Sequence, residues 1–389
     1  MPTYPTYKLS EVARSTKGKK PKTISKEKTN GFEIPYVDIK AFEKGIIDNY
    51  TDGENCTFCT PDEVLIVWDG ARCGFVGRGV EGAIGSTLAK ISSEEYINDY
   101  LFYFLQSKYK VLNSNPRGVG IPHIEPNLLW NFEIPDIDKT TQHQIVSRIE
   151  SLFAELDKAV EHLRTAQQQL KIYRHAVLNY WLNNEDGKWE MVKLGEVIEK
   201  PTYGTSKKCD YGINGIGVIR IPNIGDGVIN DEDLKYAVFY EEEKEKYSLK
   251  NGDLLTIRSN GSVDLVGKCA LITGNEEKYL FAGYLIRLRP NGERVNSKFL
   301  LRALESHSLR IQIEEKAKST SGVNNINSAE IQSLQISLPP LPEQHRIVKE
   351  IESRLSQAEA AEIRIAEALQ KTEALRQSIL KKAFSGELV

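Results

Sequence analysis

Two long stretches of the chain place apolar residues at alternating spacings of three and four, which is typical of a helix with one buried stripe. In the first stretch, the stripe comprises Ile149, Leu152, Leu156, Ala159, Leu163, Ala166, Leu170, Tyr173 and Val177. In the second, it comprises Ile351, Ala358, Ala361, Ile365, Ala368, Leu375 and Ile379, with interruptions at Arg354 and Thr372. Each helix would have about 40 residues and a length of about 60 Å. A single helix of that length with one apolar face needs a partner.

A mixed pattern of short strands and helices precedes each long helix. The predicted elements come in equivalent pairs: buried strands at 64–68 and 253–257, turns at Asp69-Gly70 and Ser259-Asn260-Gly261, and buried helices at 101–105 and 299–304. Proline marks the end of each mixed region, at Pro135 and within Pro339–Pro342. The chain therefore reads as the same sequence of elements twice.

The residues themselves also repeat in register. Gln142-His143-Gln144-Ile145-Val146 recurs 202 residues later as Gln344-His345-Arg346-Ile347-Val348. Near the start of each half, an offset of 185 aligns residues 8–12 with residues 193–197. Solenoid repeats have periods of about 20–50 residues, so this long period indicates a domain duplication. We expect the two helices to pack antiparallel, with one mixed domain at either end. The alternative is a homodimeric coiled coil between two copies of the chain.

Composition limits the class of protein. A chain of 389 residues that is 40% apolar can bury more than one core. Residues 1–4 carry no apolar signal segment, and no run of 18 apolar residues occurs, so neither secretion nor membrane spanning is expected. Five cysteines favour a reducing cytosol, and we interpret the Cys56/Cys59 pair as ordinary thiols rather than a zinc or redox site.

The charge pattern is ambiguous about nucleic acid. The net charge of −3 does not predict a DNA-binding protein. Lysines crowd one early segment: Lys17, Lys19, Lys20, Lys22, Lys26 and Lys28. From charge alone, a solvated loop is the favoured interpretation of that segment.

Several of these motifs resemble the specificity subunit of type I restriction-modification enzymes. The resemblance rests on the proline-rich lead into residues 343–348, the long helix that follows, and the tail at 383–389. Residues 194–197 and 219–224 lie in regions that look like the family's target recognition domains. The first copy departs from the pattern, because Thr141 stands where the second copy has Glu343 and its lead lacks the proline run.

The resemblance implies an α+β fold in which two duplicated mixed α/β target recognition domains are joined by two long antiparallel coiled-coil helices with pseudo-two-fold symmetry. The expected boundaries are 1–140 for the first recognition domain, 141–186 for the first spacer helix, 187–342 for the second domain, and 343–389 for the second helix and tail.

The resemblance also implies a function without catalysis in this chain. Each recognition domain would read one half of a bipartite, asymmetric target in double-stranded DNA. The helices would set the spacer and dock two methyltransferase (M) subunits, and restriction/translocase (R) subunits would join them. S-adenosylmethionine, ATP and Mg2+ are expected in those partner subunits, with no cofactor or metal in this chain. The expected location is the cytoplasm.

The residues themselves carry no recognisable catalytic motif. The chain has neither Asn-Pro-Pro-Tyr nor Asp-Pro-Pro-Tyr, no phosphate-binding loop and no HExxH metal motif. The glycines at 212–217 lack dinucleotide-binding spacing and are read as a flexible turn. We interpret His143 and His345, at the helix starts, as structural residues.

Reading of DNA needs donors that reach base edges and cations that meet phosphates. The candidates in this chain are Lys19, Lys20, Lys22, Arg72, Arg78, Arg117, Lys207, Lys208, Arg258, Ser259, Asn260, Lys268, Asn324 and Asn325. Arg258-Ser259-Asn260 follows a predicted strand directly, and either base contact or a plain surface turn would account for it. Lys207 and Lys208 are candidates for phosphates.

Two rival functions come from different classes. A cytosolic two-headed coiled-coil adaptor that binds proteins is mildly favoured by the acidic balance and by Glu241-Glu242-Glu243. A standalone enzyme with a pocket in each mixed domain is disfavoured by the missing motifs.

Overall fold

The computed structural model describes residues 4–118, 120–184, 187–317 and 322–388. The chain forms two compact units. Unit 1 comprises Met1–Arg164 with Ala366–Val389, and unit 2 comprises Thr165–Ile365. Each unit therefore contains one mixed domain together with part of both long helices.

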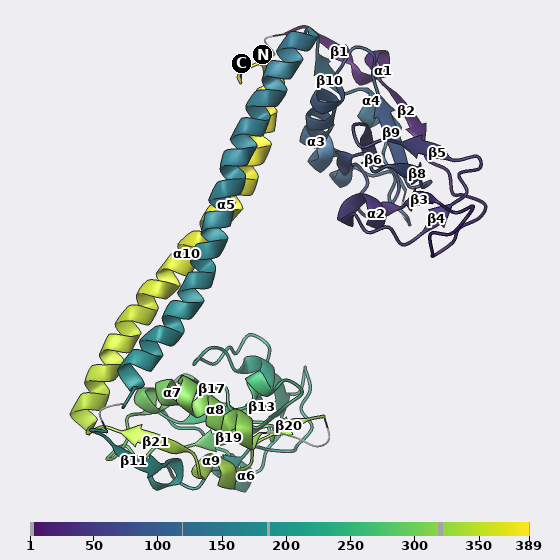
Figure 1. The fold of residues 1–389 in the computed structure, drawn as a ribbon. Helices are drawn as coiled ribbons and strands as arrows, with labels where there is room; N and C mark the ends of the chain where they lie inside the picture. Colours follow the sequence, from purple (N-terminus) through teal and green to yellow (C-terminus); the bar gives the residue numbers. More distant parts are fainter. Residues whose placement is uncertain (1–3, 119, 185–186, 318–321, 389) are drawn as a thin grey trace. The chain divides into compact units, whose positions relative to one another are not determined.

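The mixed domain of unit 1 has two four-stranded sheets, ordered β2–β9–β6–β7 and β4–β3–β8–β5, and a β1–β10 pair (Figure 1). Its strands are β1 (Thr6–Lys8), β2 (Arg14–Lys17), β3 (Ile34–Val37), β4 (Tyr50–Thr51), β5 (Thr57–Cys59), β6 (Val64–Val67), β7 (Val76–Arg78), β8 (Gly82–Ile84), β9 (Leu88–Ser92) and β10 (Glu133–Pro135). Its helices are α1 (Leu9–Val12), α2 (Ile39–Lys44), α3 (Asn98–Ser114) and α4 (Pro126–Trp130).

Strand β6 is apolar throughout because both of its faces are buried. Val64 and Ile66 belong to the core that contains Phe104 of α3. Leu65 and Val67 point to the other face and join the core that contains Phe42 of α2. Successive strand residues face opposite sides of a sheet, so a strand between two cores needs no polar positions.

The mixed domain of unit 2 repeats this arrangement, with sheets β12–β19–β15–β17 and β14–β13–β18 and the pairs β11–β21 and β16–β20. Its strands are β11 (Glu190–Lys193), β12 (Thr202–Tyr203), β13 (Ile216–Ile219), β14 (Lys235–Ala237), β15 (Leu254–Ile257), β16 (Ser259–Asn260), β17 (Cys269–Leu271), β18 (Leu280–Phe281), β19 (Leu285–Leu288), β20 (Asn324–Asn325) and β21 (Gln335–Leu338). Its helices are η1 (Leu194–Glu196), η2 (Ile221–Asn223), α6 (Glu241–Lys246), η3 (Val263–Leu265), α7 (Ser297–Glu305), α8 (His307–Lys316) and α9 (Ser328–Gln332).

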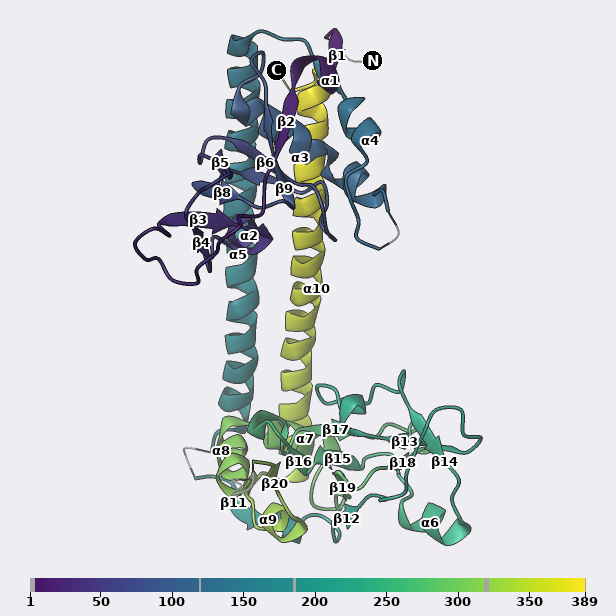
Figure 2. The same ribbon diagram turned by 90° about the vertical axis from the view of Figure 1, so that its right-hand side faces the viewer.

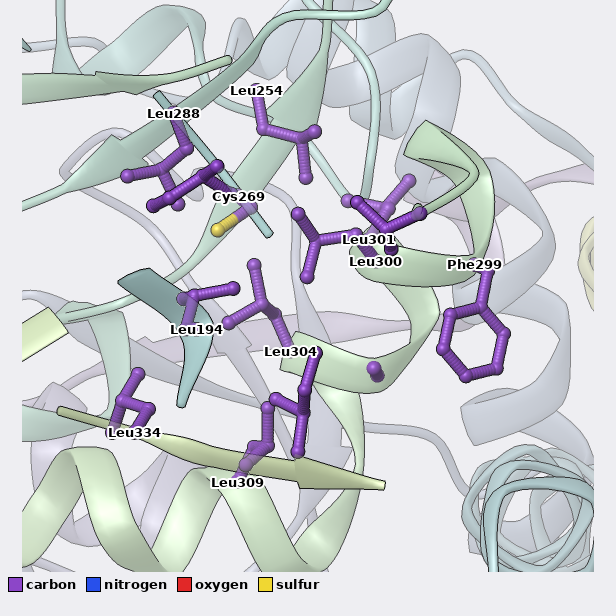
Figure 3. Packing of buried hydrophobic residues seen from close by; sticks show 14 of the residues in the cluster. Leu194, Leu254, Cys269, Leu288, Phe299, Leu300, Leu301, Leu304, Leu309 and Leu334 are labelled. Carbon is purple, nitrogen blue, oxygen red and sulfur yellow. The ribbon is translucent and has the colours of Figure 1, made fainter. Parts of the chain in front are cut away.

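One core of unit 2 lies between its main sheet and α7, and a second, which contains Leu255 and Phe281, lies on the other face of β15. Leu254 of β15 and Leu288 of β19 pack with Leu300 and Leu304 of α7, as Figure 3 shows. The predicted strands at 64–68 and 253–257 and the predicted helices at 101–105 and 299–304 are therefore confirmed. The predicted turn at Ser259-Asn260-Gly261 is wrong in one respect, because Ser259 and Asn260 pair with Asn325 and Asn324 as a short antiparallel ladder.

The long helices are α5 (Lys139–Leu182) and α10 (Leu341–Ser385), and both views of the ribbon show them side by side (Figures 1 and 2). In unit 1, Ile149 near the start of α5 shares a core with Leu380 near the end of α10. In unit 2, Val177 near the end of α5 shares a core with Ile351 near the start of α10. The helices are therefore antiparallel and pair within one chain, so the homodimeric alternative is wrong.

The predicted stripes are wrong at three positions. Ala159, Tyr173 and Leu375 are exposed. On α5, Arg174 is turned inward beside Tyr173 and donates to Glu362 of α10 at 2.9 Å. On α10, Arg376 replaces Leu375 on the packed face and pairs with Asp157. An ion pair thus stands where a hydrophobic contact was expected in each unit.

The repeated Gln-His pair at the helix starts also differs from our interpretation. Gln142 is buried: its side chain accepts from Ile97 N at 2.9 Å and donates to Glu95 O and Ile137 O. Gln344 does the same in unit 2, since it accepts from Asn296 N and donates to the carbonyls of Arg294 and Pro339. His143 and His345 are exposed. The structural residue is therefore the glutamine, not the histidine.

Candidate nucleic-acid interface

The end of the central strand of unit 2 gathers several candidate residues. Arg258 follows β15, and its Nε donates to Asn325 Oδ1 of β20 at 3.2 Å. Its guanidinium carbon lies 4.8 Å from the centre of the Tyr203 ring. Among the described residues, no carboxylate forms an ion pair with Arg258. The terminal NH2 groups, which bind guanine edges in DNA complexes, are thus left without an acidic partner.

A cleft of about 600 Å³ opens beside Arg258. Its charged lining consists of Lys207, Arg220, Lys235 and Arg258. Lys207 pairs with Glu243 at 2.6 Å, Arg220 with Asp233 at 3.3 Å, and Lys235 with Asp210 at 4.0 Å. The exposed ring of Tyr284 completes the rim. Three of the four cations thus have carboxylate partners that a phosphate would have to replace or share, and Arg258 has none in the described part of the chain. A cleft lined by cations and an aromatic ring suits a phosphate backbone and an adjacent base.

The structure brings six of the sequence candidates together in this place: Lys207, Arg258, Ser259, Asn260, Asn324 and Asn325. The amide of Asn324 donates to Gly261 O at 3.0 Å, and Asn260 Oδ1 accepts from Ser262 N at 2.9 Å. Lys268 faces elsewhere, because its ammonium pairs with Asp226 at 2.7 Å in a separate cleft that includes α5. The loop between Lys316 and Asn325 is a further DNA-binding candidate from the sequence, and its residues 318–321 lie outside the described residues.

The remaining candidates differ in whether their side chains are exposed or already paired with other residues. Lys19, Lys20, Lys22, Arg117 and Lys208 are exposed. In contrast, Arg72 pairs with Glu43 at 2.8 Å and Arg78 with Asp99 at 2.5 Å. Each of those two guanidinium groups also lies over a phenylalanine ring of its own unit. The two arginines therefore have intramolecular partners that a DNA contact would have to replace or share.

Unit 1 contains a polar cluster at the end of β6. Asp69 Oδ1 accepts from His123 Nδ1 at 2.6 Å, and Asp69 Oδ2 pairs with Lys17 Nζ at 2.8 Å. Burial raises the pKa of Asp69, but the hydrogen bonds from Lys17 and His123 outweigh burial and leave it lower than usual. The sequence alone predicted a turn at Asp69-Gly70 and placed Lys17 in the lysine-rich segment, but it did not single out either as a site residue. It likewise did not identify His123, Tyr203, Arg220 or Lys235. The strand ends at or beside Lys17, Tyr203, Arg220 and Lys235 were the one signal for those residues, whereas His123 lies in the connection between α3 and α4.

The described part of the chain has no group of three or more His, Cys, Asp or Glu side chains that could hold a metal ion. None of its helices is long and apolar enough to cross a membrane. The five cysteines are free thiols. Among the clefts, the one beside Arg258 is the strongest candidate for binding DNA, because it combines a guanidinium that has no carboxylate partner among the described residues with an exposed aromatic ring.

Comparison with known proteins decides the family. The family model for the type I restriction modification DNA specificity domain matches residues 1–163 and 186–371. The chain belongs to this family. Two matches within one chain agree with the duplication read from the sequence.

Individual relatives are consistent with that assignment. The chain is 29% identical over 351 residues to the type I restriction enzyme StySPI specificity subunit of Salmonella potsdam, covering 85% of this chain and 75% of the relative. It is 26% identical to the MjaVIII specificity subunit of Methanocaldococcus jannaschii, covering 89% and 84%. The solved HsdS subunit from Thermoanaerobacter tengcongensis shares the fold, with a TM-score of 0.61 and 22% identity over 100% of this chain and 98% of that one. A structure of a type I R-M system aligns with a TM-score of 0.76 and 22% identity over 100% and 99%.

As a type I specificity subunit, the chain serves DNA sequence recognition and is not the catalytic component. The protein-binding adaptor is not favoured. The predicted architecture of duplicated α/β domains with two long antiparallel helices is confirmed.

Proposed function

We propose that each unit reads one half of a bipartite, asymmetric DNA target. The observation that carries this proposal is a repeated fold with unlike chemistry at the same place. Unit 2 presents Arg258 with Asn325 and Tyr203, whereas unit 1 presents Asp69 with Lys17 and His123. Because the two clusters present different donors and acceptors, and each base edge has its own pattern of donors and acceptors, two such units favour two different half-sites.

The helices α5 and α10 would set the distance between half-sites and dock two methyltransferase subunits. The repeated exposed face at the helix starts, marked by His143 and His345, is the candidate docking surface, since two equivalent surfaces suit two copies of one partner. Restriction/translocase subunits would complete the complex. S-adenosylmethionine, ATP and Mg2+ would be held by the partners, and the complex would work in the cytoplasm.

The complex can be tested by measuring binding to duplex DNA at several salt concentrations, with the methyltransferase subunits present. Displacement of counterions from phosphates makes log affinity fall linearly with log salt. A salt-independent interaction, or none, would contradict DNA reading and would return the protein-binding adaptor to consideration.

The purified chain alone is expected neither to methylate nor to cut DNA. The reason is the lack of an amino-methyltransferase tetrapeptide and of a phosphate-binding loop in the sequence. Transfer of labelled methyl groups from S-adenosylmethionine to a plasmid would be measured with and without added methyltransferase subunits. Label incorporated by the chain on its own would contradict this prediction.

Arg258→Ala is expected to weaken binding of the cognate duplex by about 1–3 kcal/mol, because a bidentate guanidinium contact to guanine would be lost. Preference should relax only in the half-site read by unit 2. Lys208→Ala is the matched control: this exposed lysine would touch only phosphate, so its loss should weaken binding to all sequences alike. Unchanged affinity and unchanged base preference in Arg258→Ala would show that the ladder is a plain surface turn.

A further inference from the structure

Three positions of unit 1 occupy the same points of the fold as three positions of unit 2. The pairs are Lys17 with Tyr203, Asp69 with Ser259, and His123 with Asn325. Lys17 and Tyr203 are the last residues of β2 and β12, and Asp69 and Ser259 each lie two residues beyond the central strand. Asp69 forms an antiparallel backbone bridge with His123, as Ser259 does with Asn325.

The close packing of the residue that follows the outer strand, β2 in unit 1 and β12 in unit 2, confirms this equivalence. Gly18 follows Lys17, and a Cβ built on it would lie 2.2 Å from Gly85 O. Gly204 follows Tyr203, and its Cβ would lie 2.3 Å from Phe281 O and Ala282 O. In both units, therefore, the residue after the outer strand lies against the backbone at the end of an equivalent strand, β8 or β18. Only glycine fits there, because any side chain would clash with these carbonyl oxygens.

The two clusters share their flanking positions but differ in the central side chain. In unit 1 it is Asp69, which is equivalent to Ser259, whereas in unit 2 it is Arg258, one residue earlier in the chain. In unit 2, the guanidinium of Arg258 lies between the position of Tyr203 and that of Asn325. In unit 1, the Asp69 carboxylate lies between Lys17 and His123. One unit thus has a cation at the centre of the cluster, and the other has an anion flanked by two nitrogen groups.

The geometry of the unit 1 cluster orients His123. The ionised carboxylate of Asp69 can only accept, so Nδ1 of His123 carries the hydrogen that it donates. In the neutral ring, Nε2 is then an acceptor. The side chain of His123 is 45% exposed, and that of Lys17 is 49% exposed, so both present polar atoms at the surface.

The surroundings suit a DNA backbone. Lys19, Lys20 and Lys22 follow β2 directly and are exposed. Within the described ranges, none of the three has an ion pair with a carboxylate. In protein–DNA complexes, contacts to phosphates position the duplex and contacts to base edges read the sequence. The three lysines could make the first kind of contact, and the oriented His123 side chain could make the second.

We propose that the Lys17–Asp69–His123 cluster is the sequence-reading site of unit 1. This inference rests on the proposed function. His123 is the base-contacting residue, whose Nε2 accepts from the exocyclic amino group of adenine or cytosine in the major groove. Asp69 is a positioning residue that fixes the tautomer and orientation of the ring, and Lys17 holds Asp69 from the other side.

The test uses the assembled complex with its methyltransferase subunits and His123→Ala, His123→Asn and Asp69→Asn. His123→Asn transplants the residue of the equivalent position in unit 2. Methylated sites are mapped by sequencing DNA from cells that carry each complex. We expect preference at one position of the first half-site to fall by roughly 5- to 150-fold in His123→Ala, the range that corresponds to loss of one base contact. The second half-site should be unchanged.

Further variants separate reading from other roles. Asp69→Asn should relax the same base position as His123→Ala, because an amide no longer dictates the tautomer. A residue that only stabilised the fold would lower methylation without changing the preferred base. Lys22→Ala is the control for a phosphate contact: it should weaken binding to all sequences and reduce the salt slope by about one.

The outcomes distinguish this inference from the function on which it rests. A wild-type complex that methylates no defined sequence would contradict the proposed function itself. A wild-type complex with a defined target, together with folded His123→Ala and His123→Asn variants that keep the first half-site intact, would overturn only the reading site. If Asp69→Asn fails to fold, the half-exposed His123 variants still decide the question.

Discussion

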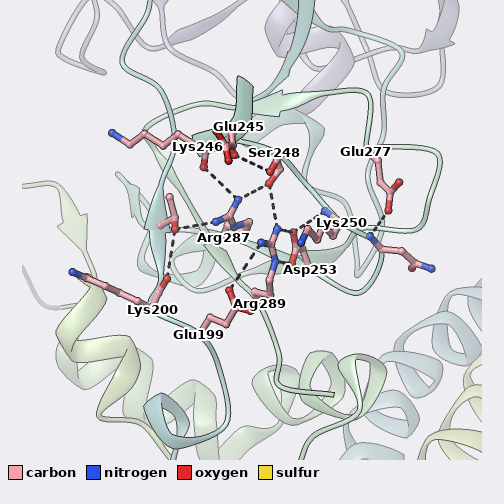
Figure 4. A network of polar contacts seen from close by, with 12 residues as sticks. Glu199, Lys200, Glu245, Lys246, Ser248, Lys250, Asp253, Glu277, Arg287 and Arg289 are labelled. Carbon is pink, nitrogen blue, oxygen red and sulfur yellow. Dashed lines mark hydrogen bonds and ion pairs between the residues drawn. The ribbon is translucent and has the colours of Figure 1, made fainter. Parts of the chain in front are cut away.

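Asp253→Ala should destabilise unit 2 by about 3–5 kcal/mol, because it leaves a charge inside the protein without its partner. The side chain of Asp253 is only 1% exposed. Its two oxygens accept from Nε and Nη2 of Arg289, both at 2.7 Å, and one also accepts from Lys250 N at 2.8 Å (Figure 4). The hydrogen bonds that Arg289 donates to Asp253 raise the pKa of Arg289 despite its burial. A guanidinium keeps its proton in proteins even without such a partner, so Arg289 would remain charged after the substitution.

The duplication supplies a matched control for this variant. Glu63 in unit 1 also stands just before the central strand and pairs with Lys90 of β9 at 2.8 Å. Its side chain is 25% exposed, so water can replace the lost partner and Glu63→Ala should cost about 1 kcal/mol. The two variants differ mainly in burial of the ion pair.

Hydrogen exchange measured by mass spectrometry would report the two units separately, which a single unfolding curve of a two-unit chain does not. Asp253→Ala should speed exchange in β15 and β19, with β6 and β9 unchanged. Equal protection of β15 and β19 in the variant and the wild type would show that the Asp253–Arg289 pair contributes little to stability.

The elements that sequence reasoning predicted correctly are those set by local pattern. Residues 64–67 are a strand and residues 101–105 lie in a helix because uninterrupted apolar runs of those lengths need two buried faces or a buried stripe. The duplication then predicted the second copy of each element and the antiparallel pairing of α5 with α10. A pattern that occurs in both copies supports the same element twice, so the prediction of that element is stronger.

The errors lie where tertiary partners override periodicity. A strict heptad pattern drifts by about 20° per heptad on a straight helix, so Tyr173 leaves the packed face and Arg174 enters it. Arg174 is acceptable there because Glu362 neutralises it. The buried glutamines were missed for a similar reason: their partners are backbone groups of distant segments, such as Ile97 N and Asn296 N.

The sequence predicted the candidate interface only where its residues are close to one another, or to a recognisable strand, along the chain. Arg258, Ser259 and Asn260 follow a recognisable strand, and Asn324 and Asn325 lie in a polar loop, so composition identified them. The unit 1 cluster joins Lys17, Asp69 and His123 from three separate segments, and no local pattern links them. Only the sheet register shows that they match the Arg258 cluster.

Lengthening both long helices together is expected to lengthen the spacer of the DNA target. Residues 165–168 of α5 and 366–369 of α10 would be duplicated, because units 1 and 2 meet in the sequence at Arg164/Thr165 and Ile365/Ala366. Four added residues lengthen a helix by about 6 Å and turn its end by roughly 40° beyond one full turn. One base pair of DNA advances about 3.4 Å and about 35°. The rotation corresponds to about one extra base pair and the length to nearly two.

The complex with both insertions should therefore recognise its two half-sites with a spacer one or two base pairs longer. Neither half-sequence should change, because the clusters around Arg258 and His123 are untouched. An insertion in α5 alone is the control. It shifts α5 along α10, so that residue pairs such as Arg174–Glu362 no longer lie opposite each other. This variant should weaken methylation without changing the length of the spacer. Methylome sequencing of cells carrying each complex decides between these outcomes. An active double-insertion complex with the original spacer would mean that the helices do not set the distance between the half-sites.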